Sequence, residues 1–382
     1  MKIETLLANL ALNSDFKDPY GASHFPIYNT ATFDLKKQEG NERIYDYSRS
    51  DNPTRNALEN IFAKAENGFG CVCTNTGIAA ISVLFETVLK NGDTVLVEND
   101  SYGGTYRLLK VLSEKNNIKT IYTDFTNLNL VEEELKNNEI SLILCESPTN
   151  PGLKIIDLEE IGKLSKKYNT LFAVDNSMAT FVSQKPLDLG ADFSVFSTTK
   201  FISGHGSVTA GAVVSKTKEL HQKVRFYANA YGNAQSPMDV YLTSLGLPTL
   251  VYRMKAQEES ALEIAKFLKN FPQIKSVKFP ALEDFEQYDL AKKQMSIIPA
   301  VLTIQLQDEE TANQLINNTK LFGKKVSYGT SDSRLEIPAK MSHATNSKDS
   351  LASKGIDNAT VRISVGLENT EDLIEDLSQA LQ

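Results

Sequence analysis

Short apolar runs of strand length alternate with longer amphipathic stretches between residues 54 and 246 of the chain. Consecutive strands separated by segments of helix length need crossover connections, and such connections build parallel sheets. A mostly parallel sheet covered by helices on both faces is therefore expected, that is, a doubly wound α/β domain. The strands are expected at 70–74, 94–98, 119–123, 140–146, 170–175, 193–197 and 208–215, and helices at 79–90, 105–115 and 158–168.

The pattern changes on both sides of this region. After residue 246 it gives way to one long helical stretch, three strands and a closing helix, which predicts a smaller α+β domain. Before residue 54, prolines interrupt any long element, so this part is expected to be an arm. The three parts are residues 1–53, 54–246 and 247–382, and the C-terminal elements before the closing helix are expected at 253–270, 274–279, 300–306 and 360–365.

Composition narrows the class of partner. With 41% hydrophobic and 23% charged residues the chain is typical of a soluble globular protein, and its net charge of -8 disfavours nucleic acid as a partner. No apolar stretch approaches the roughly 18 residues of a membrane span, and the N-terminus lacks the apolar core of a signal peptide, so we expect a cytoplasmic protein without membrane contact. The three cysteines lie in apolar runs and the four histidines are scattered, which predicts buried free thiols and no metal site.

Polar residues and glycines gather where the expected strands end. In a doubly wound sheet, ligands bind in the crevice beyond the carboxyl ends of the strands. Five such ends would face one cleft and carry the segments 74–77, 99–102, 146–151, 175–177 and 197–200. We therefore expect the ligand site there.

Two of these strand ends carry residues of a particular cofactor chemistry. Lys200 follows Ser197-Thr198-Thr199, and Asp175 closes an apolar strand. Pyridoxal phosphate (PLP) needs an amine for a Schiff base, hydroxyls for its phosphate and a carboxylate that keeps a proton on its pyridine nitrogen. Taken alone, the Ser/Thr cluster before Lys200 could be an ordinary loop, and Asp175 could simply form a turn.

Further motifs supply the remaining parts of such a site. The segment 74–77 ends in a glycine and opens a helix, whose first N–H groups can bind a phosphate. Tyr102 precedes two glycines that would let its ring lie flat on a planar cofactor, and Arg49 with Tyr47 offers a guanidinium and a phenol. Taken alone, the segment 74–77 and the segment around Tyr102 could equally be turns that bind no ligand, and the segment with Tyr47 and Arg49 could be a solvated loop. Arg362 lies in an apolar strand, so it either bridges an internal acid or binds a ligand carboxylate.

In order and spacing, these motifs resemble those of the PLP enzymes of cysteine and methionine metabolism, which have fold type I. The family includes cystathionine γ-synthase, the cystathionine lyases, methionine γ-lyase and the O-acylhomoserine sulfhydrylases. The resemblance covers nearly the whole chain. The matching stretches are Tyr47-Ser48-Arg49, Asn52-Pro53-Thr54-Arg55, Tyr102-Gly103-Gly104-Thr105, Glu146-Ser147-Pro148-Thr149-Asn150-Pro151, Val174-Asp175-Asn176, Ser197-Thr198-Thr199-Lys200, Pro338-Ala339-Lys340-Met341-Ser342-His343 and Val361-Arg362-Ile363-Ser364-Val365-Gly366.

The resemblance implies roles for individual residues. Lys200 would carry the cofactor and move protons, Asp175 would hold the pyridinium and Tyr102 would stack on the ring. The residues expected to contact the cofactor are Gly77, Ile78, Tyr102, Asn150, Asp175, Ser197, Thr199 and Lys200, together with Tyr47 and Arg49 of a neighbouring subunit. The residues expected to contact an amino-acid substrate are Arg107, Asn150, Val326, Ser327 and Arg362. The contacts from a neighbouring arm imply a homo-oligomer, at least a dimer and usually a dimer of dimers.

Within the family, the stretches 74–77, 228–232 and 239–242 look most like bacterial cystathionine γ-synthases. We therefore expect γ-replacement on an O-acylhomoserine by cysteine to give cystathionine. Val326, however, stands where synthases and cystathionine γ-lyases usually carry a glutamate, and a valine there is similar to methionine γ-lyases. The stretch 327–334 also departs from the usual Ser-Leu-Gly-Gly-x-Glu-Ser. The alternatives are cystathionine γ-lyase, cystathionine β-lyase, methionine γ-lyase and O-acylhomoserine sulfhydrylase.

Two alternatives come from other classes of protein. A PLP-binding protein without turnover would usually have lost Lys200 or Arg362, and both are present. A dinucleotide-dependent oxidoreductase would need Gly-x-Gly-x-x-Gly after the first strand, and that motif is missing. The sequence therefore favours an enzyme.

Overall fold

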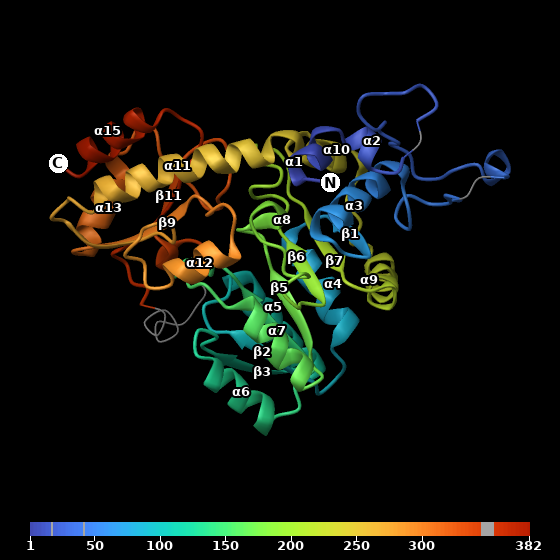
Figure 1. Ribbon diagram of the computed structural model, residues 1–382, viewed down its shortest axis with the longest axis horizontal. Helices are drawn as coiled ribbons and strands as arrows, with labels where there is room; N and C mark the ends of the chain where they lie inside the picture. The colour runs from blue at the N-terminus through green and yellow to red at the C-terminus, as the bar shows by residue number, and fades with distance from the viewer. Residues whose placement is uncertain (17, 41–42, 345–354) are drawn as a thin grey trace.

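The computed structural model describes residues 1–16, 18–40, 43–344 and 355–382 (Figure 1). Its larger sheet has seven strands in the order β1-β7-β6-β5-β4-β2-β3. Strand β7 pairs antiparallel with β1 and β6, and the other pairs are parallel, which confirms the predicted α/β fold with a mostly parallel sheet. The strands are β1 (Gly70–Thr74), β2 (Thr94–Glu98), β3 (Lys119–Thr123), β4 (Leu142–Glu146), β5 (Leu171–Asp175), β6 (Phe193–Phe196) and β7 (Gly211–Ser215).

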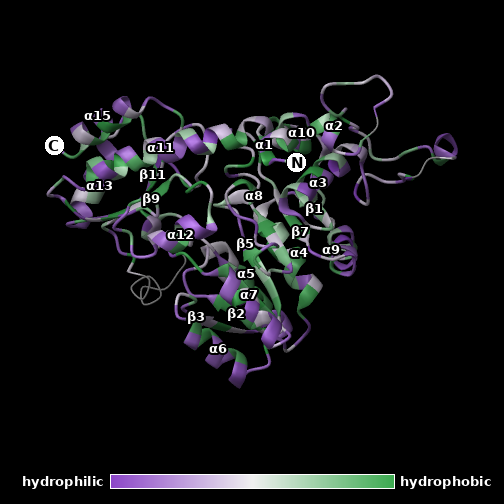
Figure 2. Ribbon diagram, in the orientation of Figure 1, coloured by the Kyte–Doolittle hydropathy of each residue, from purple (hydrophilic) through white to green (hydrophobic). Residues whose placement is uncertain are grey.

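Both faces of this sheet are buried, as crossover helices require. Along β4, Leu142 and Leu144 belong to one hydrophobic cluster, whereas Ile143 and Cys145 belong to another, so alternate residues serve the two faces. In Figure 2 the central strands are mainly coloured hydrophobic, and α9 is mainly hydrophilic. The helices of this part are α3 (Pro53–Glu66), α4 (Gly77–Val88), α5 (Gly103–Asn116), α6 (Leu128–Asn137), α7 (Leu158–Lys167), α8 (Thr180–Ser183), α9 (Lys218–Tyr231) and α10 (Pro237–Leu245).

A second sheet has five strands in the order β10-β11-β12-β9-β8 and its own hydrophobic cluster. The sequence predicted three of these strands but missed the short β10 and β11. Figure 1 shows α11 running from the side of α10 towards α13 and α15. The elements are α11 (Leu250–Leu268), β8 (Ile274–Lys278), α12 (Tyr288–Gln294), β9 (Val301–Leu306), α13 (Glu309–Asn318), β10 (Gly323–Lys324), β11 (Arg334–Glu336), β12 (Thr360–Ser364) and α15 (Thr370–Ala380).

The N-terminal segment contains the short helices α1 (Ile3–Ala8) and α2 (Leu10–Asn13) and one 3₁₀ turn, η1 (Leu35–Gln38). Figure 1 shows part of it extending away from the body of the molecule. The division of the chain at residues 53 and 246 stays a prediction. The three cysteines are buried free thiols, as expected. Of the helices in the described ranges, none is long and apolar enough to span a membrane.

Candidate active site

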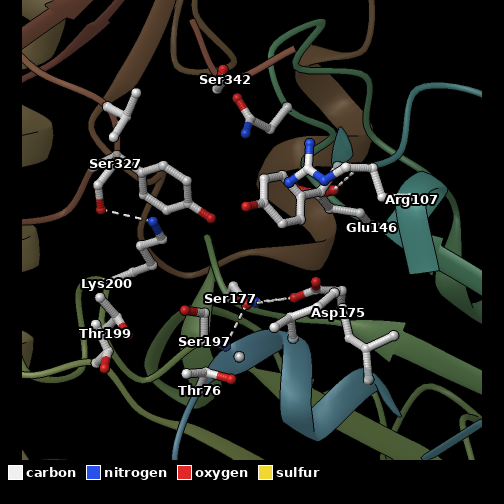
Figure 3. A pocket seen from close by; sticks show the side chains of 18 of the residues that line it. Thr76, Arg107, Glu146, Asp175, Ser177, Ser197, Thr199, Lys200, Ser327 and Ser342 are labelled. Atoms are coloured by element: carbon white, nitrogen blue, oxygen red, sulfur yellow. Dashed lines mark hydrogen bonds between the residues drawn. The ribbon is translucent and has the colours of Figure 1, made fainter. Parts of the chain in front are cut away.

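A cavity of about 410 Å³ lies at the carboxyl ends of strands of the larger sheet (Figure 3). All five predicted strand-end segments contribute to its lining. Residues 326–328, 341–342 and 362 complete it from the C-terminal part of the chain. The predicted site residues that line the cavity are Gly77, Ile78, Tyr102, Arg107, Asn150, Asp175, Ser197, Thr199, Lys200, Val326, Ser327 and Arg362.

Lys200 offers its amine to this cavity. Its Nζ donates a hydrogen bond of 2.7 Å to Oγ of Ser327, and it lies 4.9 Å from the centre of the Tyr328 ring. Burial, together with the charge of Arg362, lowers the pKa of Lys200 to about 8. An amine with such a pKa has a substantial unprotonated fraction near neutral pH, so it can act as a nucleophile and as a base.

Asp175 ends β5 between the parallel neighbours β4 and β6, opposite Glu146 and Val195. Its Oδ1 accepts hydrogen bonds from Oγ of Ser177 at 2.5 Å and from the Ser177 N–H at 3.1 Å. The Ser177 hydroxyl in turn accepts from the Ser197 N–H at 2.6 Å (Figure 3). Burial raises the pKa of Asp175. A carboxylate in such surroundings favours a cationic partner, as a protonated pyridine nitrogen would be.

The start of α4 provides a place for a phosphate. The Thr76 hydroxyl caps the helix by accepting from the Ala79 N–H at 3.1 Å, while helix geometry leaves the N–H groups of Gly77 and Ile78 without intrahelical acceptors. A Cβ on Gly77 would stand 2.6 Å from Cβ of Ser197, so only a glycine lets these two segments come together. The donor set therefore suits an anionic group at the helix start.

The aromatic side of the cavity depends on another glycine. A Cβ on Gly104 would overlap the ring of Tyr102, so the ring lies directly over this glycine. The Tyr102 N–H donates to Oε2 of Glu146 at 3.1 Å, which ties the start of α5 to the end of β4. The ring is thereby placed at the cavity wall, where it can stack on a planar group.

Arg362 satisfies both interpretations of its position. The side chain is buried and its Nη1 pairs with Oε1 of Glu336 at 2.9 Å, so it bridges an internal acid. It also lines the cavity, where Nη1 donates to Oδ1 of Asn150 at 2.9 Å and Nη2 donates to the Ser327 carbonyl at 2.6 Å. The guanidinium is thus held in place at a point that a carboxylate can reach.

Two predicted cofactor ligands lie elsewhere. Tyr47 and Arg49 are exposed on the N-terminal segment and do not line the cavity of their own chain. The Arg49 guanidinium lies 5.6 Å from the centre of the Tyr47 ring. Their expected action in a neighbouring subunit stays a prediction.

Sequence reasoning missed several lining residues. Thr76 and Ser177 belong to strand-end segments that it had marked, and Met341 with Ser342 belongs to a matched stretch, so these could have been found. Glu146 opens the strand-end segment 146–151 and could have been found in the same way. The missed lining residues are Thr76, Ile81, Glu146, Ser177, Thr209, Tyr328, Met341 and Ser342.

The buried amine, the carboxylate at a strand end and the anion site at a helix start fit PLP, and with this fold they define a PLP-dependent enzyme of fold type I. No cluster of three or more possible metal-binding His, Cys, Asp or Glu side chains occurs within the described ranges.

Comparisons with known proteins identify the family. Residues 4–382 match the family described as Cys/Met metabolism PLP-dependent enzyme, and the chain belongs to it. It is 36% identical to a cystathionine gamma-lyase of Bacillus subtilis over 100% of both chains, and 40% identical to an L-methionine gamma-lyase of Fusobacterium nucleatum over 96% of this chain and 95% of that one. The crystal structure of cystathionine gamma synthase from Xanthomonas oryzae in complex with aminoacrylate and cysteine is similar, with a TM-score of 0.95 and 37% identity over 100% of this chain and 98% of that one. The predicted family, fold type and cofactor are confirmed.

Proposed function

We propose that this enzyme catalyses γ-replacement on an O-acylhomoserine, with cysteine as the thiol and cystathionine as the product. The observation that carries the proposal is that one cavity holds an amine of lowered pKa together with two arginines, Arg362 from β12 and Arg107 from α5. Arg362 suits the α-carboxylate of the substrate, and Arg107 suits a distal acid such as that of a succinyl group. The similarity to a cystathionine γ-synthase structure supports this choice.

When bound, PLP would withdraw electrons from the substrate and so make the protons on Cα and then on Cβ acidic. Lys200 would remove the Cα proton, because its amine is unprotonated in part near neutral pH, and would pass that proton on to the cofactor. The amine, free of its proton again, would then remove the Cβ proton. Asp175 would hold a proton on the ring nitrogen of the cofactor. Asn150 and Arg362 would bind the α-carboxylate and keep Cα within reach of Lys200. The Cγ–O bond would then break, and the acyl group would leave with that oxygen and the electron pair as a carboxylate. The thiol sulfur would give up its proton and bond to Cγ, and protons would return to Cβ and Cα.

A second candidate is elimination, in which the same site releases a thiol, ammonia and a 2-oxo acid from a sulfur amino acid. Val326 favours it, because valine at the cavity mouth provides no carboxylate for the ammonium of an incoming cysteine. The similarity to a cystathionine γ-lyase and to a methionine γ-lyase supports it as well.

The proposal includes an oligomer. The exposed Tyr47 and Arg49 on the extended N-terminal segment would complete the phosphate site of a neighbouring subunit. Arg49 suits this role because a guanidinium binds a phosphate through two parallel hydrogen bonds.

A product screen by mass spectrometry tests the reaction. Purified enzyme with PLP is given O-succinylhomoserine or O-acetylhomoserine with cysteine or sulfide, and cystathionine or methionine alone. Formation of cystathionine from an O-acylhomoserine and cysteine is expected. Release of a 2-oxo acid from cystathionine or methionine, without any replacement product, would establish the second candidate instead. Lys200→Ala serves as the control for non-enzymatic products.

A further inference from the structure

Glu336 is a buried carboxylate behind the substrate site. It lies in β11 directly opposite Arg362 in the antiparallel β12, and its side chain is fully buried. Oε1 accepts from Nη1 of Arg362 at 2.9 Å and from Oγ of Ser342 at 2.6 Å, while Oε2 has no hydrogen-bond partner among the described residues. Nothing in the proposed reaction uses this carboxylate directly.

The pairing has two physical consequences. A guanidinium with one nitrogen held by a carboxylate on the neighbouring strand cannot turn, so its remaining N–H groups keep a fixed direction. Within the described residues, Arg362 Nε has no hydrogen-bond partner, so donor capacity remains. The negative charge of Glu336 also balances the positive charge of Arg362 inside the protein, where opposite charges interact strongly.

We propose that Glu336 is a positioning residue of this active site: it fixes Arg362 for the substrate carboxylate and acts through its charge on the catalytic amine of Lys200. The inference rests on the proposed roles of Arg362 and Lys200. Ser342 completes the arrangement, because it lines the cavity and donates to the same oxygen of Glu336.

The charges around Lys200 agree with the second part of the proposal. Arg362 on β12 and Arg334 on β11 lower the pKa of Lys200, whereas Glu336 on β11 and Asp175 at the end of β5 raise it. The Tyr328 ring packs against the same amine. Loss of the Glu336 charge should therefore lower the pKa of Lys200 further.

Two substitutions separate position from charge. Glu336→Gln keeps an oxygen that can accept from Arg362 and Ser342 but removes the charge. Glu336→Ala removes both. A matched control is Asp376→Asn in α15, which alters another buried carboxylate that binds the backbone N–H groups of residues 320–322.

Binding of butyrate, with butyramide as its uncharged counterpart, is measured on the PLP-loaded enzyme by ligand-observed NMR. Because this needs no turnover, it gives an answer even if the product screen contradicts γ-replacement. Glu336→Ala should weaken butyrate binding about tenfold, roughly the effect of one charged hydrogen bond, and leave butyramide unchanged. Glu336→Gln and Asp376→Asn should bind butyrate at least as tightly as the wild type.

The pH dependence of kcat, with any amino acid that is turned over, tests the charge, because the amine of Lys200 is released from the cofactor only after the substrate has bound. In Glu336→Gln the acid limb should move to lower pH, whereas in Asp376→Asn it should stay in place. Equal butyrate binding in wild type and Glu336→Ala, or an unmoved acid limb in Glu336→Gln, would overturn the proposal. If Glu336→Ala does not fold, the proposal is tested with Glu336→Gln alone. Butyrate binding to Glu336→Gln that is tenfold weaker than to the wild type would then also overturn the proposal.

Discussion

Ser177 was not predicted as a site residue, yet its hydroxyl links Asp175 and Ser197, two of the residues predicted to bind the cofactor. It donates to Asp175 at 2.5 Å and accepts from the Ser197 N–H at 2.6 Å. Burial raises the pKa of Asp175, and the hydrogen bonds from Ser177 lower it, so this hydroxyl favours the ionised carboxylate. Ser177→Ala should therefore make Asp175 harder to ionise.

The size of the effect follows from the hydrogen bond that is lost. A hydrogen bond to a charged group contributes about 1.5 to 3 kcal/mol, so the equilibrium between the ionised and the protonated carboxyl group should change by roughly tenfold to a hundredfold. The Ser177 N–H still donates to Asp175 in the variant, which places the expected change nearer the lower figure. Because an acid with a raised pKa is protonated to higher pH, the acid limb of kcat/KM should move to higher pH.

The assay compares pH profiles of kcat/KM for wild type, Ser177→Ala and Ser177→Thr, since threonine keeps the hydroxyl. Stability of the protein without cofactor gives an independent measure. A carboxyl group whose pKa is raised in the folded state stabilises the fold at pH values below its ordinary pKa of 3.8. This contribution is lost as the pH rises through the pKa of the folded state. The free energy of unfolding of Ser177→Ala should thus fall further below the wild-type value at neutral pH than near pH 4. Identical acid limbs in Ser177→Ala and wild type would refute the reasoning.

Four further predictions concern other parts of the site. Lys200→Ala should fold but lose essentially all turnover, and near-normal activity without an added amine would contradict its role. Arg49→Ala should weaken PLP binding roughly tenfold to a hundredfold, and mixing it with Lys200→Ala subunits should restore some activity; no restoration despite proven subunit exchange would place Arg49 outside the neighbour's site. Gly77→Ala should lower PLP affinity measured by equilibrium dialysis, because overpacking against Ser197 costs about 1 to 3 kcal/mol. Val326→Glu should improve the use of cysteine relative to sulfide, and Arg107→Leu should penalise O-succinylhomoserine more than O-acetylhomoserine; unchanged kcat/KM ratios in both would reject these roles.

Much of the larger domain could be predicted because its strands and helices are marked by residue patterns within short segments of the sequence. The predicted strands 70–74, 94–98 and 119–123 agree with β1, β2 and β3 at both ends. The strands β1 and β2 are short runs that are buried along most of their length, so they show no polar alternation. Strand β3 lies at the edge of the sheet and is partly exposed, and its β-branched and aromatic residues predicted it. The strand β11, by contrast, spans three residues, too few to show any period.

Asp175 ends β5 and Lys200 follows β6, so their positions at the carboxyl ends of neighbouring parallel strands followed from the topology of the sheet. The contacts that set the orientation and the pKa of the site residues could not be predicted in this way. The pairing of Glu336 with Arg362 depends on the register of β11 against β12, and the bridge by Ser177 depends on a turn between two strands. Neither register nor turn geometry is readable from residue types alone.

The departure at residues 327–334 gains a physical meaning in the structure. Ser327 has a φ of 81°, in the left-handed region that is unfavourable for residues with a side chain, and it is held there because Lys200 binds its hydroxyl and Arg362 binds its carbonyl. Tyr328 follows where the family pattern has leucine. Its ring centre lies 4.9 Å from Nζ of Lys200 and 5.3 Å from Cζ of Arg362, so the same aromatic ring contacts both side chains. Ser327 and Tyr328 therefore contact both Lys200 and Arg362, so we expect a substitution in this segment to affect both side chains.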